Sequence, residues 1–328
     1  MPYSNIRRSC LALALALGAA AAPLAWSQST DFPTKPITII VPYPAGGIVD
    51  SITRVIAEHV SKTLGQTVNV DARPGGNANI GTQAGLRAPA DGYTWVFAAS
   101  ALTANSVMYK GLWDPLKDVT GVGAVVLAPS LIAVPTTLPV NDMKELVAMA
   151  KREPGKLNFG NPGNGSSMHL NSEMFRQAAG IQLTNIPYKG QPPILIDMVR
   201  GEVQFSVYSP SIAAPQITAG KIKPLAVIAD KRLAAYPNVP TLTEAGYPEA
   251  NVVPWYGYVV NSATPRAVVM RINSAINAAL ESPEVQAKLR AMGTEPQAPR
   301  SPEQINAMIR SDYDKYRAAI VAGNITAE

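Results

Sequence analysis

The stretch that decides the fold is Val41-Pro42-Tyr43-Pro44-Ala45-Gly46-Gly47-Ile48-Val49-Asp50. The unbroken apolar run Ile37 to Val41 precedes it, and an amphipathic run from Ile48 to Leu64 follows. A buried strand, a glycine turn and a helix start are typical of an α/β protein with a parallel sheet. The two glycines can adopt positive φ and let a ligand approach the backbone, and the free N–H groups of the helix start favour an anion. An ordinary strand–helix loop without a ligand remains the alternative at this point.

The same alternation of strands, loops and helices continues along the chain. A second glycine-rich loop, Arg73 to Gly81, follows the next predicted strand, and Ser100 follows the third. A second unit starts at Asn141, which we expect to cap a helix ending at Arg152. Its strands lead into loops rich in Gly, Ser and Asn. Parallel sheets bind ligands at the carboxyl ends of their strands, so these loops are the candidate site.

Three helix starts in the last third share one design. Each places a hydroxyl residue before a proline, which predicts a capping side chain followed by proline at the first helical position. The three pairs are Thr264-Pro265, Ser282-Pro283 and Ser301-Pro302.

Composition excludes several classes of protein. The chain has 328 residues, more than one core usually serves, with 47% hydrophobic and 16% charged residues. These values are typical of a compact soluble protein. The net charge is +5, but the sequence has no block of Lys and Arg interleaved with aromatic residues, so we expect no nucleic-acid partner.

The N-terminus predicts export. Arg7 and Arg8 precede an apolar run, Leu11 to Ala22, that is too short to span a bilayer. Ala25-Trp26-Ser27 fits the cleavage rule, so a signal peptide of residues 1–27 would leave a mature chain starting near Gln28. The two arginines leave Sec and Tat export both open. The single cysteine lies inside the segment that is removed, so the mature chain has no disulfide or thiol chemistry, and we expect no transmembrane helix after it.

Six sequence blocks, taken together, resemble one family. The chain is similar to the tripartite tricarboxylate transporter substrate-binding proteins, also called the Bug family of periplasmic solute receptors. The blocks occur in family order over almost the whole mature chain, and they are 42–50, 73–81, 90–94, 163–170, 187–190 and 236–241.

The resemblance implies a fold, a location and partners. It implies an α/β, two-lobed Venus-flytrap periplasmic binding protein of type II-like architecture, with the ligand in the cleft between the lobes. Lobe 1 would take residues 28–131 and 253–328, with the C-terminal helices, and lobe 2 would take 132–252. The protein would act in transport in the periplasm as a monomer, without a cofactor. It would bind a small carboxylate and deliver it to a tripartite tricarboxylate-type membrane permease.

The candidate ligand-binding residues lie at strand ends and in the loops just after them. On lobe 1 they are Tyr43, Pro44, Ala45, Gly46, Gly47, Asp50, Gly76, Asn77, Ala78, Asn79, Ser100 and Ala101. On lobe 2 they are Asn161, Gly165, Ser166, Ser167, His169, Tyr188, Tyr208 and Ser209.

Some of these residues have a structural interpretation as well. Asp50 lies in the first helical turn, where a carboxylate accepts from free N–H groups, so we expect it mainly to order the loop, with a water-mediated ligand contact as the alternative. His169 can equally be a hydrogen-bonded histidine of a first turn. His59 is expected to be structural, and the sequence leaves open whether Lys189 faces the cleft.

An enzyme is disfavoured. The only nucleophile–base combination is Ser166 or Ser167 with His169, and no orienting acid accompanies it. No metal-ligand cluster is present in the sequence. A receptor that presents its ligand to a membrane sensor kinase would have the same fold and stays an alternative.

The second-lobe strand end suggests the ligand class. In many family members this strand ends near an aspartate, but here it reads Val207-Tyr208-Ser209-Pro210. A buried ammonium without a carboxylate partner costs several kcal/mol, so we expect a carboxylate without an amine. We expect flat apolar side chains to form walls of the site, namely Tyr43, Pro44, Tyr188, Tyr208 and Pro210. Such walls suit a ring or a short hydrocarbon, so we expect a dicarboxylate, including an aromatic, phthalate-type diacid, with citrate-like acids as the alternative.

Overall fold

The computed structural model of this chain describes residues Phe32 to Thr326, and from Pro33 onward they belong to one compact unit. The expected signal peptide and its cleavage site lie outside the described residues. Over the described range, no helix combines the length and the apolar character needed to cross a membrane.

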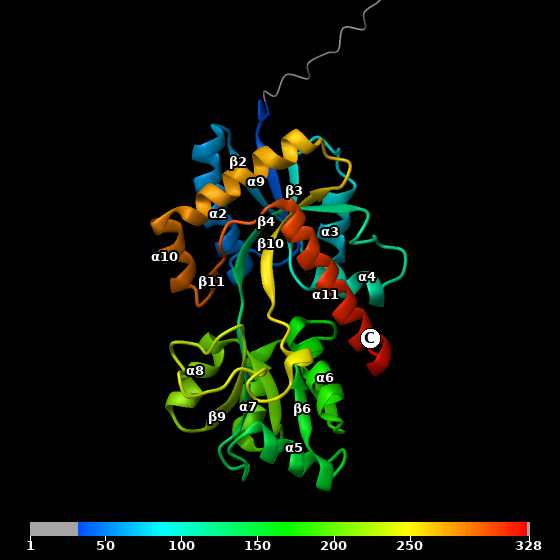
Figure 1. Cartoon of the computed structure of the whole chain (residues 1–328), viewed down its shortest axis with the longest axis vertical. Coiled ribbons are helices and arrows are strands. Elements are labelled where there is room, and N and C mark those ends of the chain that lie inside the picture. Colours follow the sequence, from blue (N-terminus) through cyan, green and yellow to red (C-terminus); the bar gives the residue numbers. More distant parts are fainter. Residues whose placement is uncertain (1–31, 327–328) are drawn as a thin grey trace, which may run out of the picture. The chain divides into compact units, whose positions relative to one another are not determined.

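The first sheet has six strands in the order β11-β4-β10-β3-β1-β2 (Figure 1). The strands β1, β2 and β3 pair in parallel, and β10 pairs antiparallel with both β3 and β4. Its strands are β1 (Ile37–Val41), β2 (Val68–Ala72), β3 (Thr94–Ala98), β4 (Val119–Leu127), β10 (Trp255–Asn261) and β11 (Glu295–Pro296). The helices in the same parts of the chain are α2 (Ile48–Leu64), α3 (Asn79–Leu86), α4 (Ala101–Met108), α9 (Arg266–Glu281), α10 (Pro283–Ala291) and α11 (Pro302–Gly323).

The second sheet has five strands in the order β7-β6-β8-β5-β9. Its β6 pairs in parallel with β7 and β8, and β5 pairs antiparallel with β8 and β9. The strands are β5 (Ser130–Pro135), β6 (Asn158–Asn161), β7 (Thr184–Pro187), β8 (Phe205–Tyr208) and β9 (Ile222–Ile228). The helices here are α5 (Met143–Arg152), α6 (Ser167–Ala179), α7 (Gln191–Arg200), α8 (Pro210–Thr218) and the short 3-10 helix η1 (Pro248–Ala250).

Both sheets are mixed, which corrects the expectation of parallel sheets. The sequence did not predict β4, β5 or β10, the strands that introduce the antiparallel pairs. In β4, Gly121 and Gly123 interrupt the apolar run, and glycine inside a strand weakens a strand prediction. Here both glycines leave room for side chains of the covering helices, because a Cβ at Gly121 would collide with Ile305 and one at Gly123 with Ile276.

The chain passes between the sheets at two places. One is the two-residue link between Leu127 of β4 and Ser130 of β5, and the other is the segment from Ile228 of β9 to Trp255 of β10. The exact lobe bounds, 28–131, 132–252 and 253–328, stay a prediction.

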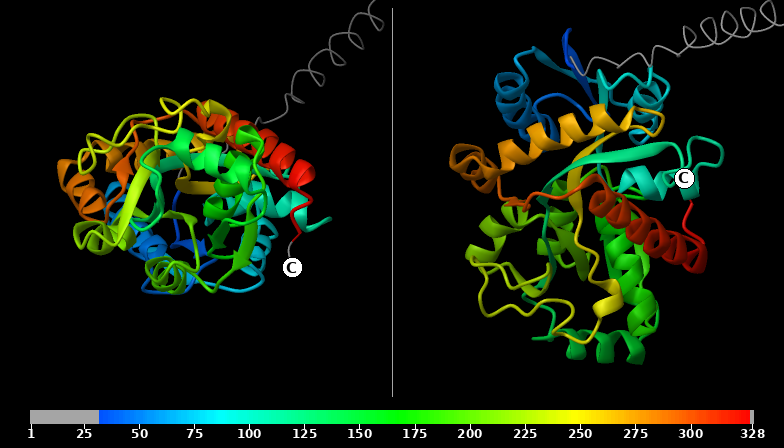
Figure 2. Two further views of the ribbon diagram at one scale, coloured as in Figure 1. Left: turned by 90° about the horizontal axis from the view of Figure 1, so that it is seen from below. Right: turned by 45° about the horizontal axis from the view of Figure 1, so that its top comes forward.

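The C-terminal helix α11 packs on elements of both sheets. Its first half buries Ile305 and Ile309 in the core around β3, β4 and β10. Its second half adds Tyr316 and Ile320 to the core around α5, α6 and the second sheet. Figure 1 and Figure 2 show this red helix beside α4 and then α6. The helix therefore ties the two halves of the fold together on the side where α4 and α6 lie.

Of the four predicted helix caps, two form as expected and two do not. Ser301 and Ser282 cap their helices as expected, with Ser282 accepting from the Val285 N–H group. Ser301 in addition forms a full capping box with Gln304, which was not predicted. Thr264 does not cap α9, since its buried hydroxyl oxygen has no hydrogen-bond partner in the described chain. The cap of α5 is Asp142, one residue later than predicted, because its side chain accepts from the Glu145 N–H group.

Candidate functional site

A cavity of about 260 Å³ lies where the two sheets face each other, and we call it the cleft cavity. Its walls come from both halves of the fold and from both links between them. Among these lining residues of the described chain there is no charged side chain. The lining residues are Ile48, Ala128, Pro129, Ser130, Ser167, Met168, Gln191, Ser209, Pro210, Ser211, Ile212, Pro254, Tyr256, Met292, Gly293 and Thr294.

Four helices begin at this cavity. Ile48 is the first residue of α2, Ser167 of α6, Gln191 of α7 and Pro210 of α8. The first N–H groups of a helix have no acceptor within it, and the dipole makes this end positive. Proline has no N–H group, so Pro192 and Pro193 of α7 and Pro210 of α8 donate nothing, and the backbone donors come chiefly from α2 and α6. The cavity therefore offers hydrogen-bond donors and positive potential without a single cationic side chain, which suits a carboxylate.

The start of α2 is held by an ion pair whose carboxylate is buried and whose guanidinium is largely exposed. Asp50 is 3% exposed, and its Oδ2 accepts from the Gly46 N–H group at 3.0 Å and from Arg54 Nε at 2.9 Å. Arg54 Nη2 donates to the other oxygen at 3.1 Å. These bonds from Arg54, together with the one from Gly46, hold the pKa of Asp50 below its ordinary value. The expected role of Asp50 in ordering the loop is therefore present, whereas a ligand contact stays a prediction.

The two loop glycines differ in conformation. Gly46 has φ +78°, in the left-handed region that favours glycine, whereas Gly47 has φ −77° and is extended. A Cβ at Gly47 would meet only the Pro44 carbonyl oxygen at 3.5 Å, an ordinary contact. Positive φ, which the sequence allows at both glycines, is therefore present only at Gly46.

The glycine-rich loop before α3 is held by asparagine side chains. Asn77 and Ala78 have positive φ although they are not glycine. Asn105 Nδ2, on α4, donates to the Asn77 carbonyl at 2.6 Å and to Asn79 Oδ1 at 2.8 Å. Asn77 Nδ2 lies 3.4 Å from the carbonyl oxygen of Asn164, which belongs to the other half of the fold. These predicted residues thus join the two halves at one edge and do not line the cleft cavity.

The start of α6 is held by neutral groups. Ser166 Oγ accepts from the His169 N–H group at 3.2 Å and caps the helix. His169 Nδ1 lies 3.1 Å from the Gly165 nitrogen and accepts a hydrogen bond from its N–H group. Burial lowers the pKa of His169 to about 4, so the ring is neutral at pH 7 and carries its proton on Nε2. This arrangement supports the structural interpretation of His169, and Asn161 likewise bonds within its own loop, to Asn164 and Gly163.

Two of the three tyrosines expected as walls, Tyr188 and Tyr208, belong to the second half of the fold. Tyr208 is fully buried in its core, with its hydroxyl on Met198 Sδ, so the expected wall role is corrected. Tyr188 is half-buried and donates to Asp197 Oδ2 at 2.8 Å. Burial and this bond raise the pKa of Tyr188 to about 12. Strand alternation explains the outcome at Tyr208, since neighbouring side chains of a strand point to opposite faces.

Other predicted residues take varied positions. Tyr43 is half-buried with its ring edge-on to Phe97, and burial raises its pKa. Ser100 is buried at the start of α4, and Lys189 is exposed. Pro44, Ala45, Gly46 and Gly47 are exposed, and Ala101 is half-buried. Ser167, Ser209 and the expected wall Pro210 do line the cleft cavity.

Sequence reasoning missed several cavity residues. Gln191 follows Gly190 at the start of α7, and its position after a strand end is a signal that could have found it. Tyr256 and the segment Met292 to Thr294 carry no such signal, because only the folded chain brings these distant residues to the cavity.

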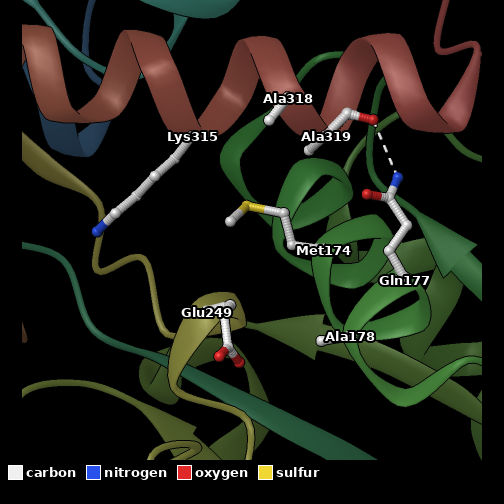
Figure 3. A pocket seen from close by; sticks show the side chains of 7 residues that line it. All are labelled: Met174, Gln177, Ala178, Glu249, Lys315, Ala318 and Ala319. Carbon is white, nitrogen blue, oxygen red and sulfur yellow. Dashed lines mark hydrogen bonds between the residues drawn. The ribbon is translucent and has the colours of Figure 1, made fainter.

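A second, larger pocket of about 420 Å³ lies between α6, η1 and α11 (Figure 3). Gln177 Nε2 donates to the Ala319 carbonyl oxygen at 3.0 Å, as the dashed line in Figure 3 shows. The pocket shares no lining residue with the cleft cavity. Nowhere in the described range do three His, Cys, Asp or Glu side chains gather so that they could hold a metal ion.

Comparisons with known proteins identify the family. The sequence profile described as "Tripartite tricarboxylate transporter family receptor" matches residues 52–325. Protein BugT of Bordetella pertussis is 31% identical over 305 residues, which cover 92% of this chain and 93% of that protein.

Solved structures agree with this match. A protein of R. palustris with adipate has a TM-score of 0.74 at 32% identity, over 90% of this chain and 99% of the other. MatC from Rhodopseudomonas palustris, with bound malate, has a TM-score of 0.72 at 26% identity, over 88% of this chain and 100% of the other. With its two α/β halves around a cleft cavity, the chain belongs to the tripartite tricarboxylate transporter receptor family, whose members are periplasmic solute-binding receptors.

Proposed function

We propose that this protein captures a small carboxylate without an amine in the cleft cavity and delivers it to a tripartite tricarboxylate-type membrane permease. The observation that carries the proposal is the convergence of four helix starts on a cavity whose lining, among the described residues, has no charged side chain. Helix N–H groups and serine hydroxyls can donate to a carboxylate. An ammonium would find no carboxylate partner there, and its burial would cost several kcal/mol.

The size and lining of the cavity favour a small diacid. A volume of about 260 Å³ is below that of typical drug-sized pockets. Relatives with bound adipate and malate support acids of this size. Apolar side chains also line the cavity, namely Ile48, Met168, Pro210, Ile212 and Pro254, and they suit a hydrocarbon chain or a ring. A dicarboxylate, including an aromatic one, is therefore our first choice, and citrate-like acids are the alternative.

The remaining predicted residues would contact the ligand through the loops that border the cleft. We propose this role for the loops 43–47, 76–79, 100–101 and 161–169. Closure of two lobes about a hinge can bring such loops onto a ligand. The lobe bounds 28–131, 132–252 and 253–328 belong to the same proposal, which the change of sheet between Leu127 and Ser130 supports.

A thermal-shift panel tests the ligand class. Purified protein is heated with phthalate, adipate, malate, citrate, aspartate or glutamate. We expect stabilisation by at least one acid without an amine and none by the two amino acids. Titration calorimetry should then give a Kd in the micromolar range or below, roughly −8 kcal/mol. Stabilisation by aspartate or glutamate alone would contradict the proposal.

Receptor function predicts that the ligand is returned unchanged. After a long incubation, mass spectrometry should find only the added acid, and a product would indicate an enzyme. Uptake of the labelled acid by cells that lack the receptor should be restored by the intact gene. Loss of a transcriptional response without loss of uptake would instead favour the sensor-kinase role.

We also propose that the protein is exported to the periplasm, loses residues 1–27 and acts as a monomer. N-terminal sequencing of periplasmic protein should begin at or near Gln28. Retention of Met1 in cytoplasmic protein would contradict the export.

A further inference from the structure

We propose that Gln191 is a positioning residue that makes the Ser209 hydroxyl a donor toward the cleft cavity, so that this wall favours a carboxylate over an ammonium. The inference rests on the proposed function, since it concerns the ligand class of the same cavity. Both residues line the cavity, and they come from the starts of different helices, α7 and α8.

The backbone of Ser209 fixes the orientation of the Gln191 amide. The Ser209 nitrogen lies 2.8 Å from Gln191 Oε1, and a backbone N–H group can only donate. The amide oxygen must therefore face this nitrogen. The amide NH₂ group then lies 3.1 Å from Ser209 Oγ. Because NH₂ has no acceptor capacity, the hydroxyl oxygen is the acceptor in this second bond.

The hydroxyl proton of Ser209 is consequently left for another partner. Ser209 precedes α8, but its side chain accepts no capping bond from that helix. One lone pair of its oxygen is already occupied by Gln191, whereas its proton can be donated to a ligand oxygen in the cavity. A carboxylate oxygen accepts this proton, whereas an ammonium has donors only, cannot take it, and finds on this oxygen just one remaining lone pair.

Gln191→Glu reverses this polarity with little change of shape. Glutamate keeps an acceptor for the Ser209 N–H group but replaces NH₂ by a carboxylate oxygen. That oxygen accepts a hydrogen bond from the Ser209 hydroxyl and places a negative charge beside the cavity. We expect the affinity for the carboxylate probe to fall about tenfold or more at pH 7.5. The probe is whichever of malate, adipate and phthalate the unaltered protein binds, measured by calorimetry.

The pH profile separates polarity from structural damage. When the introduced glutamate is protonated at low pH, it again donates to the hydroxyl oxygen, so the deficit relative to the unaltered protein should shrink between pH 7.5 and pH 4. A deficit that stays constant with pH would overturn the inference. In a Ser209→Ala background the Gln191→Glu change should cost less, because no hydroxyl remains to be turned.

Gln204→Glu is the matched control. The Gln204 side chain also makes two backbone bonds, accepting from the Asn158 N–H group and donating to the Gly201 carbonyl, but it does not line the cleft cavity. It should leave probe binding unchanged, and an equal loss would overturn the inference. Neutron diffraction of the ligand-free protein gives a readout that needs no probe. A Ser209 deuterium directed at Gln191 would overturn the inference, whereas failure of all probes with the deuterium toward the cavity would contradict only the proposed function.

Discussion

The start of α2 and the start of α6 face the same cavity but are held in different ways. At α2 a buried carboxylate, Asp50, binds the Gly46 amide and the Arg54 guanidinium. At α6 the holding groups are neutral, since Ser166 caps the helix and His169 accepts from Gly165. One end therefore depends on an ionised acid and the other on an unprotonated base.

The difference between the ion pair at α2 and the neutral groups at α6 shows two ways to order a helix start without placing a charged side chain in the cavity lining. The negative charge of Asp50 is neutralised by Arg54, whose side chain is 57% exposed, on the helix next to the cavity. The neutral groups at α6 leave its first N–H groups to a ligand. The two ends should respond differently to pH and to mutation, as the following predictions specify in order of expected effect.

The largest effect should be a pH dependence caused by His169. Its pKa is about 4 in the folded chain and ordinarily 6.5, so between these values the unfolded chain binds a proton that the folded chain does not. The free energy of unfolding should therefore fall by about 3 kcal/mol as pH drops from 6.5 to 4. Urea denaturation at several pH values measures this slope, and His169→Gln should abolish it.

A second group, Asp312, changes the free energy of unfolding with pH in the opposite direction to His169. It therefore has to be substituted before the contribution of His169 is measured. Burial raises its pKa from 3.8 to about 6, although Trp255 Nε1 donates to Oδ2 at 2.7 Å. Its folded form keeps a proton that the unfolded form loses, so its contribution falls as pH rises through this window. The comparison is therefore made in Asp312→Asn, and an unchanged slope after His169→Gln in that background would contradict the prediction.

At the start of α2 the expected effect is smaller. Asp50→Asn removes the charge that holds Arg54 and should lower the free energy of unfolding by about 2 kcal/mol at pH 7. Because the pKa of Asp50 is lowered, its contribution is complete above the ordinary value of 3.8 and is lost as pH falls through the folded pKa. Arg54→Gln should cost less than Asp50→Asn, since the Arg54 side chain is largely exposed and solvent screens its charge. Equal stability of Asp50→Asn and the unaltered protein would refute the role of the ion pair.

The two glycines of the same loop offer a matched pair. Gly46→Ala places a side chain at φ +78° and should cost about 1–2 kcal/mol through backbone strain alone, since no atom lies within 4 Å of the added Cβ. Gly47→Ala should be nearly neutral in stability. Thermal unfolding of both variants tests this difference. A larger loss of stability in Gly47→Ala than in Gly46→Ala would contradict the positive φ at Gly46.

The smallest effect should separate capping from binding at α6. Ser166→Ala removes the cap and should cost about 1 kcal/mol of stability. Ser167→Ala should leave stability unchanged and weaken probe binding, because Ser167 lines the cleft cavity and Ser166 does not. If both variants changed stability equally, the division of roles between the two serines would be refuted.

Local features of the fold were predictable from the sequence because they depend on neighbouring residues. The apolar run of β1, the stripe of α2 and its end at Gly65, and the capping box at Ser301 follow from spacing and side-chain type. The ordered blocks from 42–50 to 236–241 indicated the family, which the profile match over 52–325 confirms.

The cleft cavity was predictable only in part. Ser167, Ser209 and Pro210 line it as expected, since helix starts after strand ends are recognisable in a sequence. Tyr208 was misplaced because both faces of β8 are covered in the folded chain, with Phe205 and Val207 in one core cluster and Tyr208 in another. Gln191 was missed because its two bonds to Ser209 join residues of different helices.

The sequence by itself determined the α/β class, the family and the loops rich in Gly, Ser and Asn, because these follow from local periodicity, capping and turn chemistry. Only the tertiary structure decided that both sheets are mixed, that α11 spans both cores, and that Met292 to Thr294 reach the cleft cavity. It also decided that Gln191 orients Ser209. The physical reason is that packing and hydrogen bonds between distant segments depend on distances that a linear pattern does not contain.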